Sequence, residues 1–446
     1  MNKNFMEQFP EWICTTPEGG IKILSQILYK HLKNDLKLKI SDKGNYFLYR
    51  NGLYALVSER ELKSIIKSHI PVELRKPKDW NTVWLEFCSD KPNVIENDFD
   101  SNENLVPFKN GVLELDSGKL VEYNEKMLLT RRINCKYYVD KTLDDAPVFK
   151  EYLKTLCNNN TSHMNFLLEY IGAILSNVKG WKFKKLLILV GEGNTGKTQI
   201  RELTMDLLGR EYCVSIDMKK LNERFATAQL YKKRLAGSGD MSSVEIEEMA
   251  IIKNLTGGDS LFAEFKGKNG FSFVYEGLLW FNANSLPYFR GDRGKHVYDR
   301  FNIIKCENII PLEKRDPKLI EKMLTEKDII ASIAIDKLKE VIDRNYELSE
   351  SIDMLTIRRD YIIENNSLLS FVKECCCDLY SGLTKRSEFN KVYTAWCSVN
   401  RVRPERERSI GQQLFEYYQI EAKKRNGYYY YPINIEDAVL LDLDIK

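Results

Sequence analysis

Eight consecutive residues, GEGNTGKT at positions 191–198, have the types and spacing of a phosphate-binding loop, G-x-x-x-x-G-K-T. Glycines let successive backbone amides converge on phosphate oxygens, and the dipole of a following helix also attracts the anion. The lysine would neutralise the β- and γ-phosphates, and the threonine hydroxyl would ligate Mg²⁺. An apolar run precedes the loop and a helical pattern follows it, as such a loop requires. We therefore predict that ATP and Mg²⁺ are bound by Gly191, Glu192, Gly193, Asn194, Thr195, Gly196, Lys197 and Thr198.

A candidate catalytic carboxylate lies downstream, in KRLAGSGDMSS, where Asp240 follows a strand-like stretch. A carboxylate there can hold Mg²⁺ through water and polarise the attacking water. Gly239 precedes it, where many ATPases place a second acid, so the identity of the catalytic base stays open. The alternative is that Asp240 caps a helix beginning near Ser243, a role that is compatible with catalysis.

Another strand-like segment, GLLWFNANSLP, ends in Asn282 and Asn284 before Pro287 stops it. If this strand lies beside the strand that leads into the loop, the amide of Asn284 can orient the attacking water against the γ-phosphate. The alternative is an ordinary turn, since Asn and Pro are common turn residues.

Three arginines follow, Arg290, Arg293 and Arg300, the last within YDRF. A guanidinium that reaches the γ-phosphate of a neighbouring subunit would act as an arginine finger. A surface salt bridge explains the same residue equally well.

The segment LFAEFKGKNGFSFVYEG predicts a β-hairpin with Lys266 and Lys268 beside a Lys-Asn-Gly turn. Basic side chains at an exposed turn suit contact with nucleic-acid phosphates, although a solvated turn has the same composition.

A basic window lies near the C-terminus: residues 385–425 contain ten Lys and Arg against five Glu. Two helical patterns and a hairpin turning at Asn426-Gly427 follow the plan of a winged helix, which binds DNA with a helix and a wing. The alternative is a packing module whose basic face is merely solvated. We predict DNA contacts from Arg401, Arg403, Lys423, Lys424 and Arg425.

Composition limits the class of protein. The 446 residues are 43% hydrophobic with a net charge of +3, so packed cores are expected and any nucleic-acid surface must be local. The first residues lack the apolar region of a secretory signal, and apolar runs are too short to span a membrane. The ten cysteines form no C-x-x-C pair and the four histidines have no finger-like spacing, which indicates a reduced, cytoplasmic protein without structural zinc.

The elements that must position these residues alternate between strands and helices, as in an α/β motor. We predict an α/β P-loop (AAA+-like) motor at 179–310 and a helical lid or connector at 311–366. An α+β domain at 1–105 and a hairpin with a helical collar at 106–178 precede the motor, and a winged helix at 367–446 ends the chain.

The order of GEGNTGKT, GD, KNLTGGD, AEFKGK, FNANSLP and YDRF resembles superfamily 3 helicases, and more narrowly the C-terminal region of phage, plasmid and poxvirus-type primase–helicases. The resemblance covers roughly residues 45–365. A short chain without a primase domain is similar to the replication initiators of staphylococcal pathogenicity islands and related mobile elements.

This resemblance implies Walker A at residues 191–198, the Walker B acid at Asp240, a sensor at Asn284 and a finger at Arg300. It places Lys266 and Lys268 in a DNA-contacting hairpin. It further implies a homo-oligomer, a hexameric ring with ATP between subunits, that moves on single-stranded DNA, usually 3′ to 5′. Two alternatives to an ATP-driven helicase and initiator stay open. One is an ATP-gated protein that binds or melts origin DNA, and the other, less consistent with the hairpin and the basic module, is a phosphotransferase without a motor.

Overall fold

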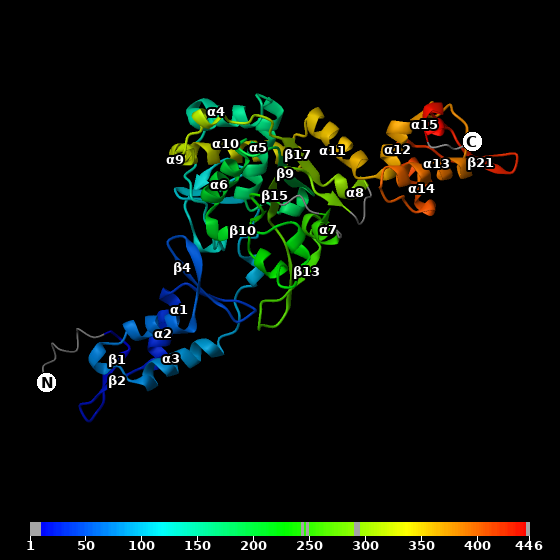
Figure 1. Cartoon of the computed structure of the whole chain (residues 1–446). Coiled ribbons are helices and arrows are strands. Elements are labelled where there is room, and N and C mark those ends of the chain that lie inside the picture. The colour runs from blue at the N-terminus through cyan, green and yellow to red at the C-terminus, as the bar shows by residue number, and fades with distance from the viewer. Residues whose placement is uncertain (1–9, 242–244, 247–248, 290–294, 443–446) are drawn as a thin grey trace.

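Three lobes follow one another along the chain in the computed structural model (Figure 1). The structure describes residues 10–241, 245–246, 249–289 and 295–442. The predicted helix start near Ser243 therefore lies outside the described residues. Within those ranges, no helix is both long and apolar enough to cross a membrane.

The N-terminal lobe combines short strands with three helices around one small core. Its elements are β1 (Ile13–Thr15), β2 (Ile21–Ile23), α1 (Ser25–Asp35), β3 (Leu38–Ile40), β4 (Tyr46–Arg50), β5 (Leu53–Val57), α2 (Glu59–Ser68) and α3 (Pro77–Ser89). A hairpin turn joins β4 to β5: Arg50 pairs with Leu53, and the two turn residues, Asn51 and Gly52, have φ of 51° and 88°, as an Asn-Gly turn favours.

A three-stranded sheet connects this lobe to the centre: β6 (Leu105–Phe108), β7 (Gly111–Glu114) and β8 (Leu120–Val121). The hairpin is present, but its turn lies one residue earlier than the Asn110-Gly111 pair suggests, because Phe108 pairs with Gly111. Gly111, with φ of 150°, is instead the first residue of β7.

A five-stranded parallel sheet forms the centre of the molecule, in the order β10-β11-β15-β9-β17. The strands are β9 (Leu186–Val190), β10 (Cys213–Ser215), β11 (Leu235–Gly237), β15 (Leu278–Ala283) and β17 (Phe301–Lys305). Every residue of β9 and β15 is buried, as expected for strands covered on both faces.

Helices cover both faces of this sheet. Leu187, Leu189 and Trp280 share one core with α4 (Pro147–Leu156), α5 (Thr161–Leu175), α6 (Lys197–Leu208), α9 (Leu319–Thr325) and α10 (Lys327–Asp343). Leu186, Ile188 and Phe281 share the other core with α7 (Ala250–Gly257), α8 (Lys295–Tyr298) and α11 (Ile352–Glu364). The segments before and after the predicted motor therefore pack into its layers, while the domain limits themselves stay a prediction.

Two further two-stranded sheets accompany the central one: the antiparallel pair β13 (Ser260–Ala263) and β14 (Phe271–Val274), and the parallel pair β12 (Glu245–Ile246) and β16 (Tyr288–Phe289).

The C-terminal lobe has its own core and stands apart from the sheet (Figure 1). Its elements are α12 (Ser367–Cys375), β18 (Cys376–Cys377), β19 (Thr384–Lys385), α13 (Arg386–Val399), α14 (Glu407–Tyr418), β20 (Lys423–Arg425), β21 (Tyr428–Tyr431), β22 (Asn434–Ile435) and α15 (Asp437–Asp442).

Candidate nucleotide site and nucleic-acid contacts

The predicted strand–loop–helix around residues 191–198 is confirmed: β9 ends at Val190 and α6 begins at Lys197. Two positions in the loop require glycine. A side chain on Gly191, with φ of 156°, would lie 2.1 Å from the carbonyl oxygen of Cys306, and Gly196 has φ of 93°. The backbone therefore turns sharply between strand and helix, and Glu192, Gly193 and Asn194 are exposed on the turn.

The side chain of Lys197 folds into the loop and is only 7% exposed. Its ammonium donates to the carbonyl oxygens of Gly191 at 2.6 Å and Glu192 at 2.7 Å, and to the buried hydroxyl of Thr195 at 3.1 Å. Burial lowers the pKa of Lys197, and the neighbouring charge of Asp240 opposes that shift. The loop therefore holds a cation at its centre, in the position from which a lysine can meet phosphate oxygens.

Thr198 and Asp240 are exposed beside each other at this edge of the sheet. A side chain on Gly239 would lie 3.9 Å from the methyl group of Thr198, which brings the loop after β11 against the start of α6. This loop is anchored to β15, since the amide of Met241 donates to the carbonyl of Asn282 at 2.7 Å. A hydroxyl and a carboxylate are the oxygen ligands that Mg²⁺ prefers, so these two residues fit the ion.

The two asparagines of β15 differ in environment. Asn282 is 1% exposed, donates to the carbonyl of Lys197 at 2.9 Å and accepts from the indole of Trp280 at 2.9 Å. Asn284 follows the strand directly and is exposed. Because β15 pairs with β9 and the amide of Gly191 donates to Ala283, Asn284 emerges next to the loop.

Arg300 lies at the opposite edge of the sheet from the loop, where the parallel strands begin. It precedes β17, whose first residue pairs with Leu186 and whose last, Lys305, pairs with Val190 beside the loop. Lys305 is five positions after Arg300, which corresponds to ~16 Å along a strand. Its guanidinium donates to the hydroxyl of Thr256 at 2.7 Å, and burial lowers its pKa. The other two predicted arginines, Arg290 and Arg293, lie outside the described residues.

A cavity of about 1120 Å³ opens beside the loop, and the sequence did not indicate it. Residues from α4 and from the segment after β17 line it, with Asn194 and Gly196 on the loop side. The hydroxyl of Tyr152 donates to the carbonyl of Gly196 at 2.8 Å, and the backbone amide of Ile310 donates to the carbonyl of Asn194 at 3.0 Å. Its walls come from segments more than 150 residues apart in the chain, so no local motif marks it.

The predicted hairpin is confirmed as β13 and β14, with Lys266 and Lys268 both exposed. Its tight turn is at Lys266-Gly267 rather than at the Lys-Asn-Gly sequence, because the amide of Lys268 donates to Phe265 and Gly267 has φ of 75°.

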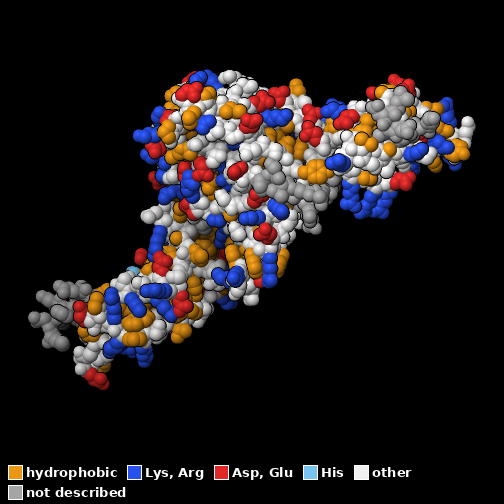
Figure 2. Space-filling view, in the orientation of Figure 1, with side chains coloured by type: hydrophobic (Ala, Val, Ile, Leu, Met, Phe, Trp, Pro, Cys, Tyr) orange, Lys and Arg blue, Asp and Glu red, His pale blue; other side chains and the backbone are white. Residues whose placement is uncertain are grey.

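The basic C-terminal side chains also reach the surface. Arg401 and Arg403 are exposed between α13 and α14, and so are Lys423, Lys424 and Arg425 on β20. The hairpin turn at Asn426-Gly427 is confirmed by positive φ at both residues. Figure 2 shows Lys and Arg side chains gathered on the lower side of this lobe.

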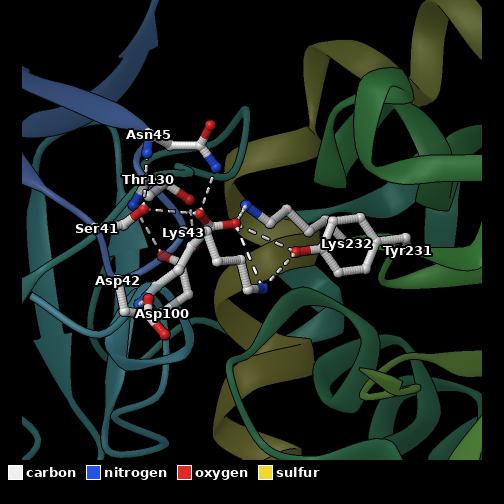
Figure 3. Close-up of polar contacts among 9 residues, drawn as sticks. Ser41, Asp42, Lys43, Asn45, Asp100, Thr130, Tyr231 and Lys232 are labelled. Carbon is white, nitrogen blue, oxygen red and sulfur yellow. Dashed lines mark hydrogen bonds and ion pairs between the residues drawn. The ribbon is translucent and has the colours of Figure 1, made fainter. Parts of the chain in front are cut away.

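A buried carboxylate joins the N-terminal lobe to the centre. Glu96, 5% exposed, accepts from Asn45 at 2.6 Å on one side and from Lys232 at 3.1 Å and Tyr231 at 3.3 Å on the other. Figure 3 shows the two groups of side chains converging from the two parts of the chain. Burial alone would raise the pKa of Glu96, but hydrogen bonds from Asn45 and Lys232 lower it to about 2.

The ring of Tyr231 continues this connection to the hairpin. It packs edge-on against Phe271 at 4.9 Å and Phe273 at 5.4 Å, between ring centroids, and both residues belong to β14. Because Phe271 pairs with Ala263 next to the turn, this contact links Glu96, through Tyr231, to the turn side of the hairpin.

Comparison with known proteins is consistent with this arrangement. The family model "D5 N terminal like" matches residues 25–158, and that of a family of unknown function, DUF5906, matches residues 189–300, from the end of β9 to Arg300. "Putative helicase L207/L206" of Acanthamoeba polyphaga mimivirus is 24% identical over 47% of the chain and 22% of its own length. "Putative helicase 184R" of Invertebrate iridescent virus 6 is 25% identical over 48% of the chain and 23% of its own length.

The chain thus spans about a quarter of the length of the curated relatives that it matches. Among solved structures, the apo form of the NrS-1 C-terminal region (305–718) aligns with a TM-score of 0.51 and 16% identity, over 92% of this chain and 100% of that one. The chain is therefore similar in sequence to the D5 N terminal like family and to viral proteins named as putative helicases, and in fold to the C-terminal region of NrS-1.

Proposed function

We propose that this chain is an ATP-dependent DNA helicase and replication initiator of a mobile element. In this proposal it forms a hexameric ring that hydrolyses ATP between subunits and moves 3′ to 5′ on single-stranded DNA. The observation that carries the proposal is that the residues proposed for ATP hydrolysis lie at opposite ends of the parallel strands of one sheet. Lys197, Thr198, Asp240 and Asn284 share the edge with the loop, whereas Arg300 lies at the other.

The edge with the loop has the groups that hydrolysis of ATP requires. Lys197 would exchange its carbonyl partners for the β- and γ-phosphates, and Thr198 and Asp240 would hold Mg²⁺, which would supply positive charge to the phosphate oxygens. The exposed amide of Asn284 orients the attacking water. The cavity beside Asn194 and Gly196 has the room and the partly apolar walls to receive the adenine of ATP.

Arg300 completes a site only if it is supplied by a neighbouring subunit. An arginine side chain extends roughly 7 Å from its Cα, less than half of the ~16 Å that separates Arg300 from the loop of its own subunit. A guanidinium supplied in trans stabilises the charge that develops on the transferred phosphoryl group. Hydrolysis therefore requires an oligomer.

Exposed lysines provide contacts with DNA. Lys266 and Lys268 at the tip of the β13–β14 hairpin contact phosphates of the single strand, and the aromatic contact between Tyr231 and Phe271, next to the turn, transmits movement. The order α12, β19, α13, α14, β20 and β21 in the C-terminal lobe follows the winged-helix plan, with the β20–β21 turn as its wing.

The assembly is tested by measuring the mass of the protein in solution with and without ATP and single-stranded DNA. A ring predicts that the mass rises to a defined multiple of the 52.1 kDa chain when both are present. A protein that stays monomeric while it hydrolyses ATP contradicts the proposed interface.

A second candidate function is ATP-gated binding and melting of origin DNA without processive unwinding. The separate core of the C-terminal lobe favours it, because a basic module with its own core can hold duplex DNA while the motor acts locally. Displacement of a long annealed strand distinguishes the two functions, since only the helicase releases it.

A further inference from the structure

Three side chains with metal-ligating atoms lie together in the N-terminal lobe, away from the ATP site. His31 and Asp35 belong to α1, and His69 follows the last residue of α2. Each offers one ligand atom, and these atoms lie within 4.8 Å of one another. His31 and Asp35 share a helix face because they are four residues apart. Leu32 of α1 and Ile66 of α2 belong to the same buried core, which fixes the two helices relative to each other.

The ring of His69 is already oriented as a ligand. Its Nδ1 lies 2.9 Å from the carbonyl oxygen of Ile65, and because a carbonyl can only accept, Nδ1 carries the proton. The lone pair is therefore on Nε2. Metal-ligating histidines are commonly held by this kind of hydrogen bond from the other ring nitrogen to a backbone carbonyl.

Trp12 supports both imidazoles. Its indole nitrogen donates to the backbone carbonyl of His69 at 3.0 Å, and its ring packs against that of His31 with centroids 4.4 Å apart. In the described part of the chain, no hydrogen bond or ion pair joins His31, Asp35 and His69 to one another. The cluster is thus assembled by the surrounding fold, and direct bonding among its members does not account for it.

We propose that His31, Asp35 and His69 form a binding site for a divalent transition-metal ion, and that Zn²⁺ is the ion it takes. Two imidazoles and one carboxylate suit Zn²⁺, whereas Mg²⁺ and Ca²⁺ prefer oxygen ligands alone. Tetrahedral zinc places neighbouring ligand atoms about 3.3 Å apart, so side-chain rotation closes the present spacing. A water completes the coordination on the exposed side of Asp35, and the ion links α1 to the end of α2.

The test uses the full chain, treated with a chelator and then titrated with ZnCl₂ by calorimetry. We expect one equivalent to bind with a dissociation constant below ~10 μM. His31→Ala and His69→Ala should each weaken binding by at least ~100-fold, since loss of a supporting partner alone costs 10- to 100-fold. Asp35→Asn should weaken it at least ~10-fold, and because Asp35 is exposed this variant keeps the fold intact.

Cysteines provide the main competing ligands, with Cys14 half-buried and Cys88 exposed in the same lobe. The titrations are therefore repeated in a Cys14→Ser/Cys88→Ser background, and with Co²⁺, whose thiolate complexes absorb intensely in the near ultraviolet. We expect unchanged zinc affinity in that background and a cobalt spectrum without the thiolate band. Glu73→Gln, an exposed carboxylate of the same lobe, and His163→Gln, in the central sheet domain, serve as matched controls and should bind as the parent does. Zinc binding that is absent, that disappears with the two cysteines, or that survives loss of both His31 and His69 overturns the proposal.

Discussion

Replacing Arg300 by alanine tests whether this residue acts on ATP that is bound at the loop of a neighbouring subunit. If Arg300 acts on the γ-phosphate of a neighbouring subunit, Arg300→Ala should bind ATP normally but hydrolyse it ~10³-fold more slowly, a loss of about 4 kcal/mol of transition-state stabilisation. The same substitution removes the hydrogen bond to Thr256, so it should also lower the free energy of unfolding by about 1.5 to 3 kcal/mol.

A matched variant separates the two effects. Thr256→Val removes the same hydrogen bond but keeps the guanidinium, so it should lose comparable stability while its turnover stays within a few-fold of the parent. Steady-state ATPase assays, nucleotide titrations and thermal unfolding of both variants provide the comparison.

Mixing two inactive variants then shows whether Arg300 acts in trans. In an equal mixture of Arg300→Ala with Lys197→Ala, up to about one quarter of interfaces pair an intact loop with an intact arginine, and ATPase activity should return accordingly. If Arg300→Ala hydrolyses ATP normally, or if the mixture stays as inactive as its components, the reasoning is refuted and the finger must be sought at Arg290 or Arg293.

Four further outcomes are expected. Lys197→Ala should abolish ATP hydrolysis and leave the circular dichroism spectrum unchanged, and near-normal ATPase would exclude the proposed site. Replacing Lys266 and Lys268 together by alanine should preserve basal ATPase but reduce its stimulation by DNA, and full stimulation would place the DNA contact elsewhere. Deleting residues 367–446 should keep ATPase activity and make duplex binding less dependent on salt, by about 0.9 in the log–log slope for each DNA phosphate that this lobe neutralises, and an unchanged slope would show that the lobe does not bind DNA. Glu96→Gln should lower the free energy of unfolding by at most about 3 kcal/mol above pH 5. Because the folded pKa of Glu96, about 2, lies below its unfolded value, this loss relative to the parent should shrink as the pH falls from 4.5 towards 2. A loss that does not depend on pH would contradict the ion pair of Glu96 with Lys232.

Features that depend on neighbouring residues could be predicted from the sequence. The loop at 191–198, the hairpin with Lys266 and Lys268, and the turns at Asn51-Gly52 and Asn426-Gly427 each follow from the backbone freedom of glycine and asparagine within a few residues. Where a stretch offers two possible turns, the sequence does not decide which one forms. The hairpin turns tightly at Lys266-Gly267 and not at the Lys-Asn-Gly sequence, because local preference alone does not fix the register of the strands.

Features that depend on strand order could not be predicted in this way. That Arg300 lies at the edge opposite the loop follows only from the pairing of β17 with β9. The cavity beside Gly196 and the contact between Glu96 and Lys232 likewise join segments more than 130 residues apart. The spacing of the histidines along the chain likewise does not reveal that the ligand atoms of His31, Asp35 and His69 lie within 4.8 Å of one another.

Strand displacement on a forked DNA tests the central claim, ATP-driven unwinding, most directly. The substrate carries a single-stranded 3′ tail on the loading strand, and release of the annealed strand is measured with ATP, with a non-hydrolysable analogue and with the Lys197→Ala variant. We predict release by the parent protein with ATP alone, and none in the other two reactions. Release without hydrolysis, or DNA-stimulated ATPase without any release, would contradict the proposal that this chain is a helicase.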